Sequence, residues 1–247
     1  DPAYVPAEVG RSDALIAAGR TEAGIEVLEQ LARSYPERAD IWGALGDILR
    51  REERYGDAVN AYDKAIATFK GDDPGQWVVY YTRGIAHERT RDWPGAEADF
   101  RKALALKPDQ PSVLNYLGYS YLERKENYDE ALAMIEKAVA ERPDGGAIVY
   151  SLSWALYRLG RYGEAVGHLE KAVELMPVDA VVNDHLGDVY WAVDRKREAE
   201  FQWKRALSFK PDTEEEAKRI RRKLEVGLDT VLKEEGAEPL AVTKNGD

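Results

Sequence analysis

The chain has 247 residues, of which 44% are hydrophobic and 33% charged, and its formal net charge is -11. This acidity disfavours a surface that binds phosphates, so we expect no nucleic-acid partner. The absence of cysteine excludes disulfides, thiol nucleophiles and Cys-ligated metals. No apolar run approaches the roughly 18 residues that cross a bilayer. Because the chain opens at Asp1 without an initiator Met, we expect it to be a segment of something longer.

Columns of small residues recur along the chain with one shared period. Two alanine columns both advance by 38, 35, 34 and 34 residues, and a third column advances by 38, 34, 35 and 34. The columns are Ala58, Ala96, Ala131, Ala165, Ala199; Ala65, Ala103, Ala138, Ala172, Ala206; and Gly46, Gly84, Gly118, Ser153, Gly187. This period predicts helix-turn-helix units of 34 residues. Two insertions explain the departures, one in the loop at 71–75 and one within or beside residues 123–128.

In chain order we expect an irregular lead-in over residues 1–9 and six units over 5–38, 39–72, 77–110, 111–145, 146–179 and 180–213. The first unit is degenerate, because Gly24 stands where later units have Ala. The second is predicted to have helices over 39–51 and 55–69. The third has the polar residues Arg83 and His87 at positions that are usually apolar.

The segment after residue 213 is predicted to form one capping helix over 214–235, followed by a disordered tail over 236–247. Its apolar stripe predicts packing onto the last unit, and its basic face is expected to be solvated. A reading of this face as a nucleic-acid or lipid site is disfavoured by acids in the same segment. The stripe is Ala217, Ile220, Leu224, Leu228 and Val231, and the basic face is Lys218, Arg219, Arg221, Arg222 and Lys223.

The unit from Asn183 to Pro211 carries Leu186, Gly187, Tyr190, Ala199, Trp203, Ala206 and Pro211. At these offsets it resembles a tetratricopeptide repeat (TPR), with Asn183 where Trp is usual and Trp203 where Phe is usual. The resemblance implies an all-α fold, a right-handed α-α superhelix. It would be a TPR solenoid of about six repeats plus the capping helix.

The sequence contains no recognisable catalytic motif. Phosphate-binding, dinucleotide-binding, nucleophile-elbow and zinc-protease motifs are absent. His87, His168 and His185 fall in different units at different phases, and the pair Asp184 and Asp188 alone is too nonspecific for a metal site. We therefore expect no enzyme, no cofactor and no metal.

In TPR proteins, the first-helix residues that are out of phase with the anchors line a concave groove. Tyr and Trp anchor partners well, so the aromatic residues at these positions predict a bound peptide or protein. The two aspartates favour a partner with Lys or Arg. The alternative is that the rings pack between repeats. The implied groove set is Tyr81, Ile85, Asn115, Tyr119, Tyr150, Trp154, Tyr157, Asp184, Asp188 and Trp191.

Residues 115–139, 153–169 and 185–192 resemble the C-terminal half of proteobacterial TPR proteins of the cell envelope. Among these are outer-membrane lipoproteins that act as adaptors for a carboxyl-terminal processing protease. The resemblance implies a non-catalytic adaptor, periplasmic or attached to the outer membrane, for a protease or cell-wall enzyme. Alternatives are a cytoplasmic location, a scaffold that self-associates through its end helices to form a homo-oligomer, and the regulatory arm of an enzyme.

Overall fold

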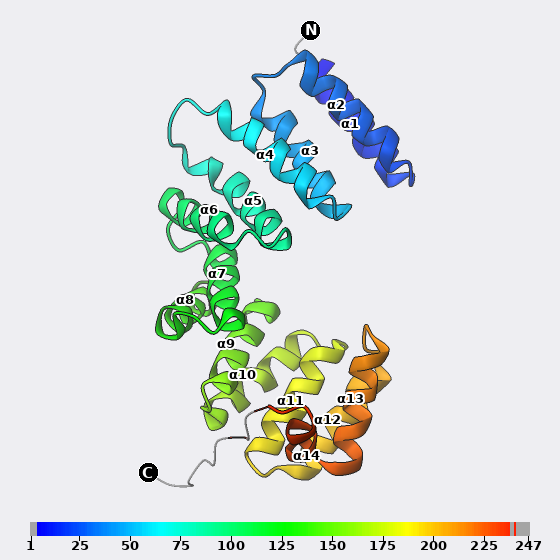
Figure 1. Cartoon of the computed structure of the whole chain (residues 1–247), viewed down its shortest axis with the longest axis vertical. Helices are drawn as coiled ribbons and strands as arrows, with labels where there is room; N and C mark the ends of the chain where they lie inside the picture. Colours follow the sequence, from blue (N-terminus) through cyan, green and yellow to red (C-terminus); the bar gives the residue numbers. More distant parts are fainter. Residues whose placement is uncertain (1–3, 238–239, 241–247) are drawn as a thin grey trace. The chain divides into compact units, whose positions relative to one another are not determined.

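The structure is a computed structural model that describes residues 4–237 and 240, and it is helical throughout, with no strand among these residues. It divides into two compact units, residues 1–113 and 114–247, which are treated separately below. Figure 1 labels the helices. They are α1 (Tyr4–Ala17), α2 (Thr21–Ser34), α3 (Ala39–Arg51), α4 (Tyr55–Ala67), α5 (Trp77–Arg89), α6 (Trp93–Leu106), α7 (Pro111–Arg124), α8 (Tyr128–Glu141), α9 (Gly146–Arg158), α10 (Tyr162–Leu175), α11 (Ala180–Ala192), α12 (Lys196–Ser208), α13 (Glu214–Val226) and α14 (Leu228–Glu234).

The twelve helices α1 to α12 form six successive pairs, one for each predicted repeat. Helix α3 has the predicted bounds, whereas α4 ends at Ala67, two residues earlier than expected. The irregular lead-in was a wrong prediction, because α1 already begins at Tyr4. Pro6 lies in the first turn of that helix, where its missing N–H removes no helical hydrogen bond. Ser12 then ties α1 to α2 by donating to the Gly24 carbonyl at 2.8 Å.

The small-residue columns lie where paired helices approach most closely. Every member of the two alanine columns is fully buried, at 0% exposure. A side chain on Gly187 would place its Cβ 2.4 Å from the Trp203 ring, and one on Gly46 would lie 2.5 Å from Tyr62. Close-packed helices leave no room for such an atom. The predicted period therefore reflects helix-helix contact.

The turn inside each pair has one backbone conformation. One residue of the turn has positive φ in all six pairs, at spacings of 34, 38, 34, 35 and 34 residues. It is the second residue after the first helix, except after α7, where it follows the helix directly. Its N–H and the next one donate back to carbonyls of the preceding turn, which ends the helix. These residues are Gly19, Glu53, Arg91, Lys125, Gly160 and Asp194. Only two of the six are glycine, the residue that adopts this conformation most readily.

Both predicted insertions fall in connections. The longer one contains a short 3-10 helix, Pro74–Gln76, whose first turn is capped by the Asp73 side chain. The shorter one lies between the end of α7 at Arg124 and the start of α8 at Tyr128. The helices on either side keep their register.

The polar pair of the third repeat, Arg83 and His87, contacts carboxylates inside the first unit. Arg83 donates to both oxygens of the buried Asp99, at 2.8 and 2.6 Å, and to Asp63 on α4 at 2.6 Å. His87 Nδ1 lies 2.8 Å from a carboxylate oxygen of Asp92. Buried polar groups need such partners. The two residues thus replace apolar packing with a network that joins α4, α5 and α6.

The segment after residue 213 forms two helices, so the prediction of one helix over 214–235 was wrong. The break is at Gly227, whose φ of 82° and ψ of 160° only glycine adopts readily. The Trp191 ring lies where a Cβ of residue 227 would be, 2.4 Å away. Lys223, expected on the solvated face, is fully buried. The predicted tail is described only at 236, 237 and 240, and its remainder lies outside the described residues.

Candidate functional site

Two predicted groove residues, Tyr81 and Ile85, lie on α5 in the first unit, and both are partly buried. The Tyr81 ring centroid is 5.9 Å from that of Trp77 and 6.1 Å from that of Phe100. Burial raises the pKa of the Tyr81 hydroxyl. At this position the ring takes part in packing within the repeat.

The other eight predicted residues lie in the second unit, on its successive first helices α7, α9 and α11. Asn115 and Tyr119 come from α7. The Oδ1 atom of Asn115 is buried and accepts no hydrogen bond from the part of the chain that the structure describes. Tyr119 is partly exposed, and its hydroxyl lies near that of Tyr150 on α9.

Rings from α9 and α11 stack into a row. Trp154 lies face to face with His185, at a centroid distance of 4.0 Å and an interplanar angle of 8°. Tyr157 stacks on Trp154 at 5.0 Å and 14°. Tyr150 stacks on His185 at 5.8 Å, and its hydroxyl is 2.8 Å from His185 Nδ1. With Tyr119, these four residues are called the aromatic row below, and all five are partly exposed.

His185 is a site residue that the sequence analysis missed. Burial lowers the pKa of its imidazole to about 4, so the ring is neutral at pH 7 and stacks without a charge. Burial also raises the pKa values of Tyr150 and Tyr157. The sequence spacing could have indicated this contact, because His185 follows Tyr150 by 35 residues, which is one 34-residue repeat plus one residue. A first-helix residue just after a groove position therefore faces the preceding repeat.

A carboxylate borders the row. Glu123, at the end of α7, accepts from Trp154 Nε1 at 3.4 Å and lies 3.6 Å from Arg158. Its side chain is 47% exposed. The rings thus have an accessible anionic edge.

The two predicted acids of the groove, Asp184 and Asp188, are covered in the structure. The Lys223 ammonium of α13 lies 2.7–2.9 Å from all four of their carboxylate oxygens. Asp188 also accepts from Trp203 Nε1 at 2.9 Å. Burial raises the pKa of Asp184 above its usual range. The cation that the sequence led us to expect from a partner is supplied here by the chain itself.

The last predicted groove residue, Trp191, is partly covered by the C-terminal helices. Its Nε1 donates to Asp229 of α14 at 2.8 Å, and its ring lies against the backbone of Gly227. Lys196 Nζ lies 3.8 Å from the ring centroid, and the Trp203 ring is 5.4 Å away. Of the eight predicted groove residues in the second unit, the five on α7 and α9 and Trp191 on α11 are partly exposed, while Asp184 and Asp188 are buried.

Chemically, this arrangement suits binding. Over the described ranges 4–237 and 240, no group of three His, Cys, Asp or Glu residues is placed to hold a metal ion. Over the same ranges, no helix is long and apolar enough to cross a membrane. The repeated helical pairs and the partly exposed rings are those of a protein-protein interaction scaffold.

Comparison with known protein families agrees with this interpretation. The tetratricopeptide repeat profile matches residues 9–74 and 121–180, and a second profile of the same repeat matches residues 77–110. The chain belongs to the tetratricopeptide repeat family. Proteins of this family are generally non-catalytic interaction scaffolds.

Two curated bacterial proteins are similar to this chain in sequence. The TPR repeat-containing protein PA4667 of Pseudomonas aeruginosa is 30% identical over 186 residues, which cover 75% of this chain and 31% of that protein. The cytochrome c-type biogenesis protein CycH of Rhizobium meliloti is 33% identical over 108 residues, which cover 44% of this chain and 28% of that protein. The chain thus spans about a third of the length of the curated relatives it matches.

Solved structures show the same fold. A chain of the APC/C hetero-tetramer Cut9-Hcn1 superimposes with a TM-score of 0.73 at 18% identity, covering 90% of this chain and 42% of that one. YrrB, described as a TPR protein with an unusual peptide-binding site, gives a TM-score of 0.58 at 20% identity, covering 76% and 94%. At these identities, the likeness concerns the fold.

Proposed function

We propose that this chain is a non-catalytic adaptor that binds a peptide or protein partner against the aromatic row of the second unit. The observation that carries the proposal is that four of the row's five rings, all but Tyr119, are fixed by stacking on one another while each stays partly exposed. A ring that is already ordered loses little conformational entropy when a partner binds. Tyr and Trp also offer apolar area together with a hydrogen-bonding edge.

The proposed partner carries Lys or Arg. Asp184 and Asp188 already bind Lys223, so the carboxylate offered to that cation is the exposed Glu123 beside Trp154. The Tyr119 and Tyr150 rings would lie against the adjoining part of the partner. The peptide-binding site named for YrrB supports a peptide ligand on this fold, although its sequence is only 20% identical.

We propose the cell envelope as the location, either the periplasm or the outer membrane. The support is the resemblance of residues 115–139, 153–169 and 185–192 to envelope adaptors, together with the similarity to a Pseudomonas protein. In this proposal the chain brings a substrate to a protease or a cell-wall enzyme and has no catalytic part in the reaction.

The test is an affinity capture from an extract of the source organism, with captured proteins identified by mass spectrometry. It compares wild type with Tyr119→Ala/Tyr150→Ala/Trp154→Ala and with a control, Phe201→Ala, which removes a 59% exposed ring from α12. Circular dichroism checks that all three proteins are folded. A protein captured by wild type and by the control but lost by the triple variant supports the proposal. Equal capture by all three, or no specific capture, contradicts it.

A further inference from the structure

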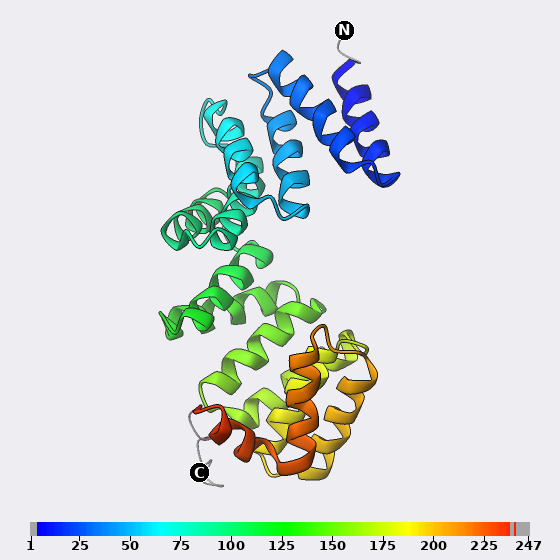
Figure 2. The same cartoon turned by 45° about the vertical axis from the view of Figure 1, so that its right-hand side comes forward.

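The C-terminal helix α14 is held against the second unit by apolar side chains and by one indole hydrogen bond. Leu228 is 0% exposed and Val231 is 3% exposed. Between them, Asp229 accepts from Trp191 Nε1 at 2.8 Å. Figure 2 shows α14, in red, following the end of α13.

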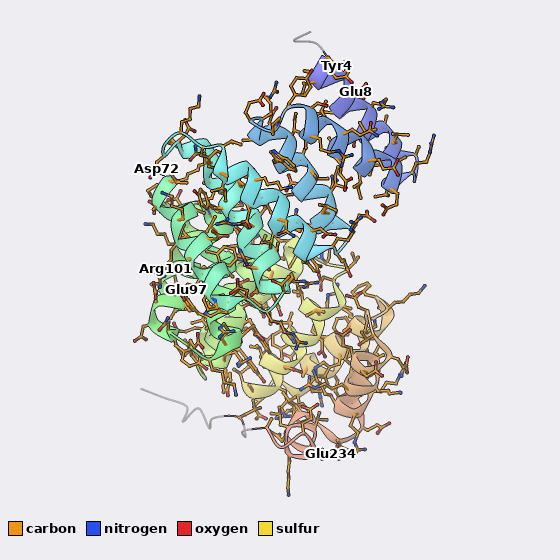
Figure 3. All side chains as sticks on the ribbon, turned by 45° about the horizontal axis from the view of Figure 1, so that its top comes forward. Tyr4, Glu8, Asp72, Glu97, Arg101 and Glu234 are labelled. Carbon is orange, nitrogen blue, oxygen red and sulfur yellow. The ribbon has the colours of Figure 1, made fainter. Side chains whose placement is uncertain are left out.

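Two further acids of this segment pair with cations on α13. Glu235 accepts from Arg219 at 2.7 and 3.1 Å. Glu234, labelled in Figure 3, accepts from Arg222 at 3.1 and 2.6 Å. Each arginine makes two contacts to one carboxylate, the geometry that a guanidinium recognises best. The ion pairs are partly exposed, so each adds little on its own, but a lysine in place of either acid would replace the attraction to Arg219 or Arg222 with a repulsion.

The surface beneath α14 is therefore formed by Trp191, Arg219 and Arg222, and we call it the C-terminal docking surface. It offers a ring, an indole donor and two guanidinium groups. The helix seated on it has the complementary pattern, with two buried apolar residues and three acids within residues 228–235. At seven residues, α14 is too short to be a stable helix on its own, so its structure depends on this surface.

Helix α13 is held independently of α14. Lys223 joins it to Asp184 and Asp188, and Ile220 and Ala217 are buried with it. Departure of α14 would thus leave α13 in place and uncover the C-terminal docking surface intact.

We infer that the C-terminal docking surface is a second binding site, which takes an acidic amphipathic peptide, and that α14 occupies it as a competitor from the same chain. The partner is defined by what α14 supplies: a carboxylate for Trp191 Nε1, apolar side chains beside it, and carboxylates for Arg219 and Arg222. This chemistry is opposite in charge to that of the partner proposed for the aromatic row. The two proposals stand or fall separately, because neither Arg219 nor Arg222 belongs to that row.

The experiment releases α14 without altering the surface. The variant is Glu234→Lys/Glu235→Lys in the full chain, and the matched control is Glu136→Lys/Glu141→Lys, with the same charge change at exposed positions of α8. The probe is a fluorescent synthetic peptide of residues 226–237, followed by anisotropy. A second peptide with Asp229→Asn/Glu234→Gln/Glu235→Gln removes the acids and keeps the shape. Hydrogen exchange over residues 228–235 reports whether α14 has been released.

We expect the released variant to bind the acidic peptide at least ten-fold more tightly than wild type or the control does, because a tethered segment competes at an effective concentration of about 1 mM. The neutral peptide should bind it at least ten-fold more weakly. Equal affinity of all proteins, equal affinity of both peptides, or unchanged protection of residues 228–235 would each overturn the inference. So would concentration-dependent dimerisation of wild type through this segment, since a second copy would then be the occupant.

Discussion

The buried ammonium of Lys223 gives the sharpest test of how the last repeat is held. In Lys223→Met, Asp184 and Asp188 lose the cation that lies 2.7–2.9 Å from their four oxygens. Removing one partner of a buried ion pair typically costs about 3–5 kcal/mol, because the charge left behind is neither solvated nor paired. Asp188 keeps its bond from Trp203, so we expect the lower end of that range, about 3 kcal/mol. Lys218→Met, at an exposed position of the same helix, should cost less than about 0.5 kcal/mol.

The destabilisation caused by Lys223→Met should become smaller as the pH falls. Burial already raises the pKa of Asp184, and Lys223 opposes that rise, so its loss raises the pKa further. At pH 5, Asp184 of the folded variant is then protonated. In the unfolded chain, where this aspartate has its ordinary pKa, it is largely ionised. Folding is therefore favoured as the pH falls from 7 to 5, and the deficit should shrink by about 1 kcal/mol.

Urea unfolding at both pH values, followed by circular dichroism and tryptophan fluorescence, measures the deficit. Hydrogen exchange of α13 shows whether the loss is local to that helix. A deficit below about 1 kcal/mol at pH 7, or one that grows at pH 5, would refute the view that this ion cluster holds α13 in place.

Two more predictions test the packing of the repeats and the neutral histidine. Gly187→Ala should destabilise the chain by about 1–3 kcal/mol, because its Cβ would lie 2.4 Å from the Trp203 ring. Gly167→Ala should instead stabilise the chain by about 0.5–1 kcal/mol, because nothing lies within 4 Å of its Cβ. Thermal melts decide both signs, and the same sign for the two variants would contradict the packing argument. Between pH 7 and pH 5 wild type should lose up to about 2 kcal/mol more than His185→Gln, since the unfolded histidine gains a proton that the folded ring, with a pKa of about 4, resists. Urea titrations at the two pH values check this, and parallel losses would show that folding does not lower the pKa of the His185 imidazole.

The helical repeats could be predicted from sequence because they depend on side-chain size at fixed spacing. The alanine columns are fully buried, and a Cβ at Gly46 or Gly187 would clash with the ring of Tyr62 or Trp203. Such a requirement leaves a period that can be read from one sequence. The start of α1 at Tyr4 differs from the predicted irregular lead-in because Pro6 lies in the first turn of the helix, where proline is accepted.

The contacts between repeats could not be predicted in the same way. Lys223 was assigned to the solvated face of a helix from its charge, yet it pairs with Asp188 at a separation of 35 residues, the same separation that joins Tyr150 to His185. Helical periodicity within one segment does not show what the preceding repeat offers. The break at Gly227 depends likewise on the Trp191 ring, which is 36 positions earlier in the sequence and adjacent in space.

The turn conformation shared by the six pairs offers positions at which substitution can raise the stability of the protein. Glu53, Arg91, Lys125 and Asp194 each hold a left-handed backbone that costs a residue with a side chain about 1 kcal/mol, whereas Gly19 and Gly160 adopt it freely. None of the four belongs to the aromatic row or to the C-terminal docking surface. Replacing these four turn residues with glycine should therefore stabilise the scaffold and leave both proposed binding surfaces unchanged.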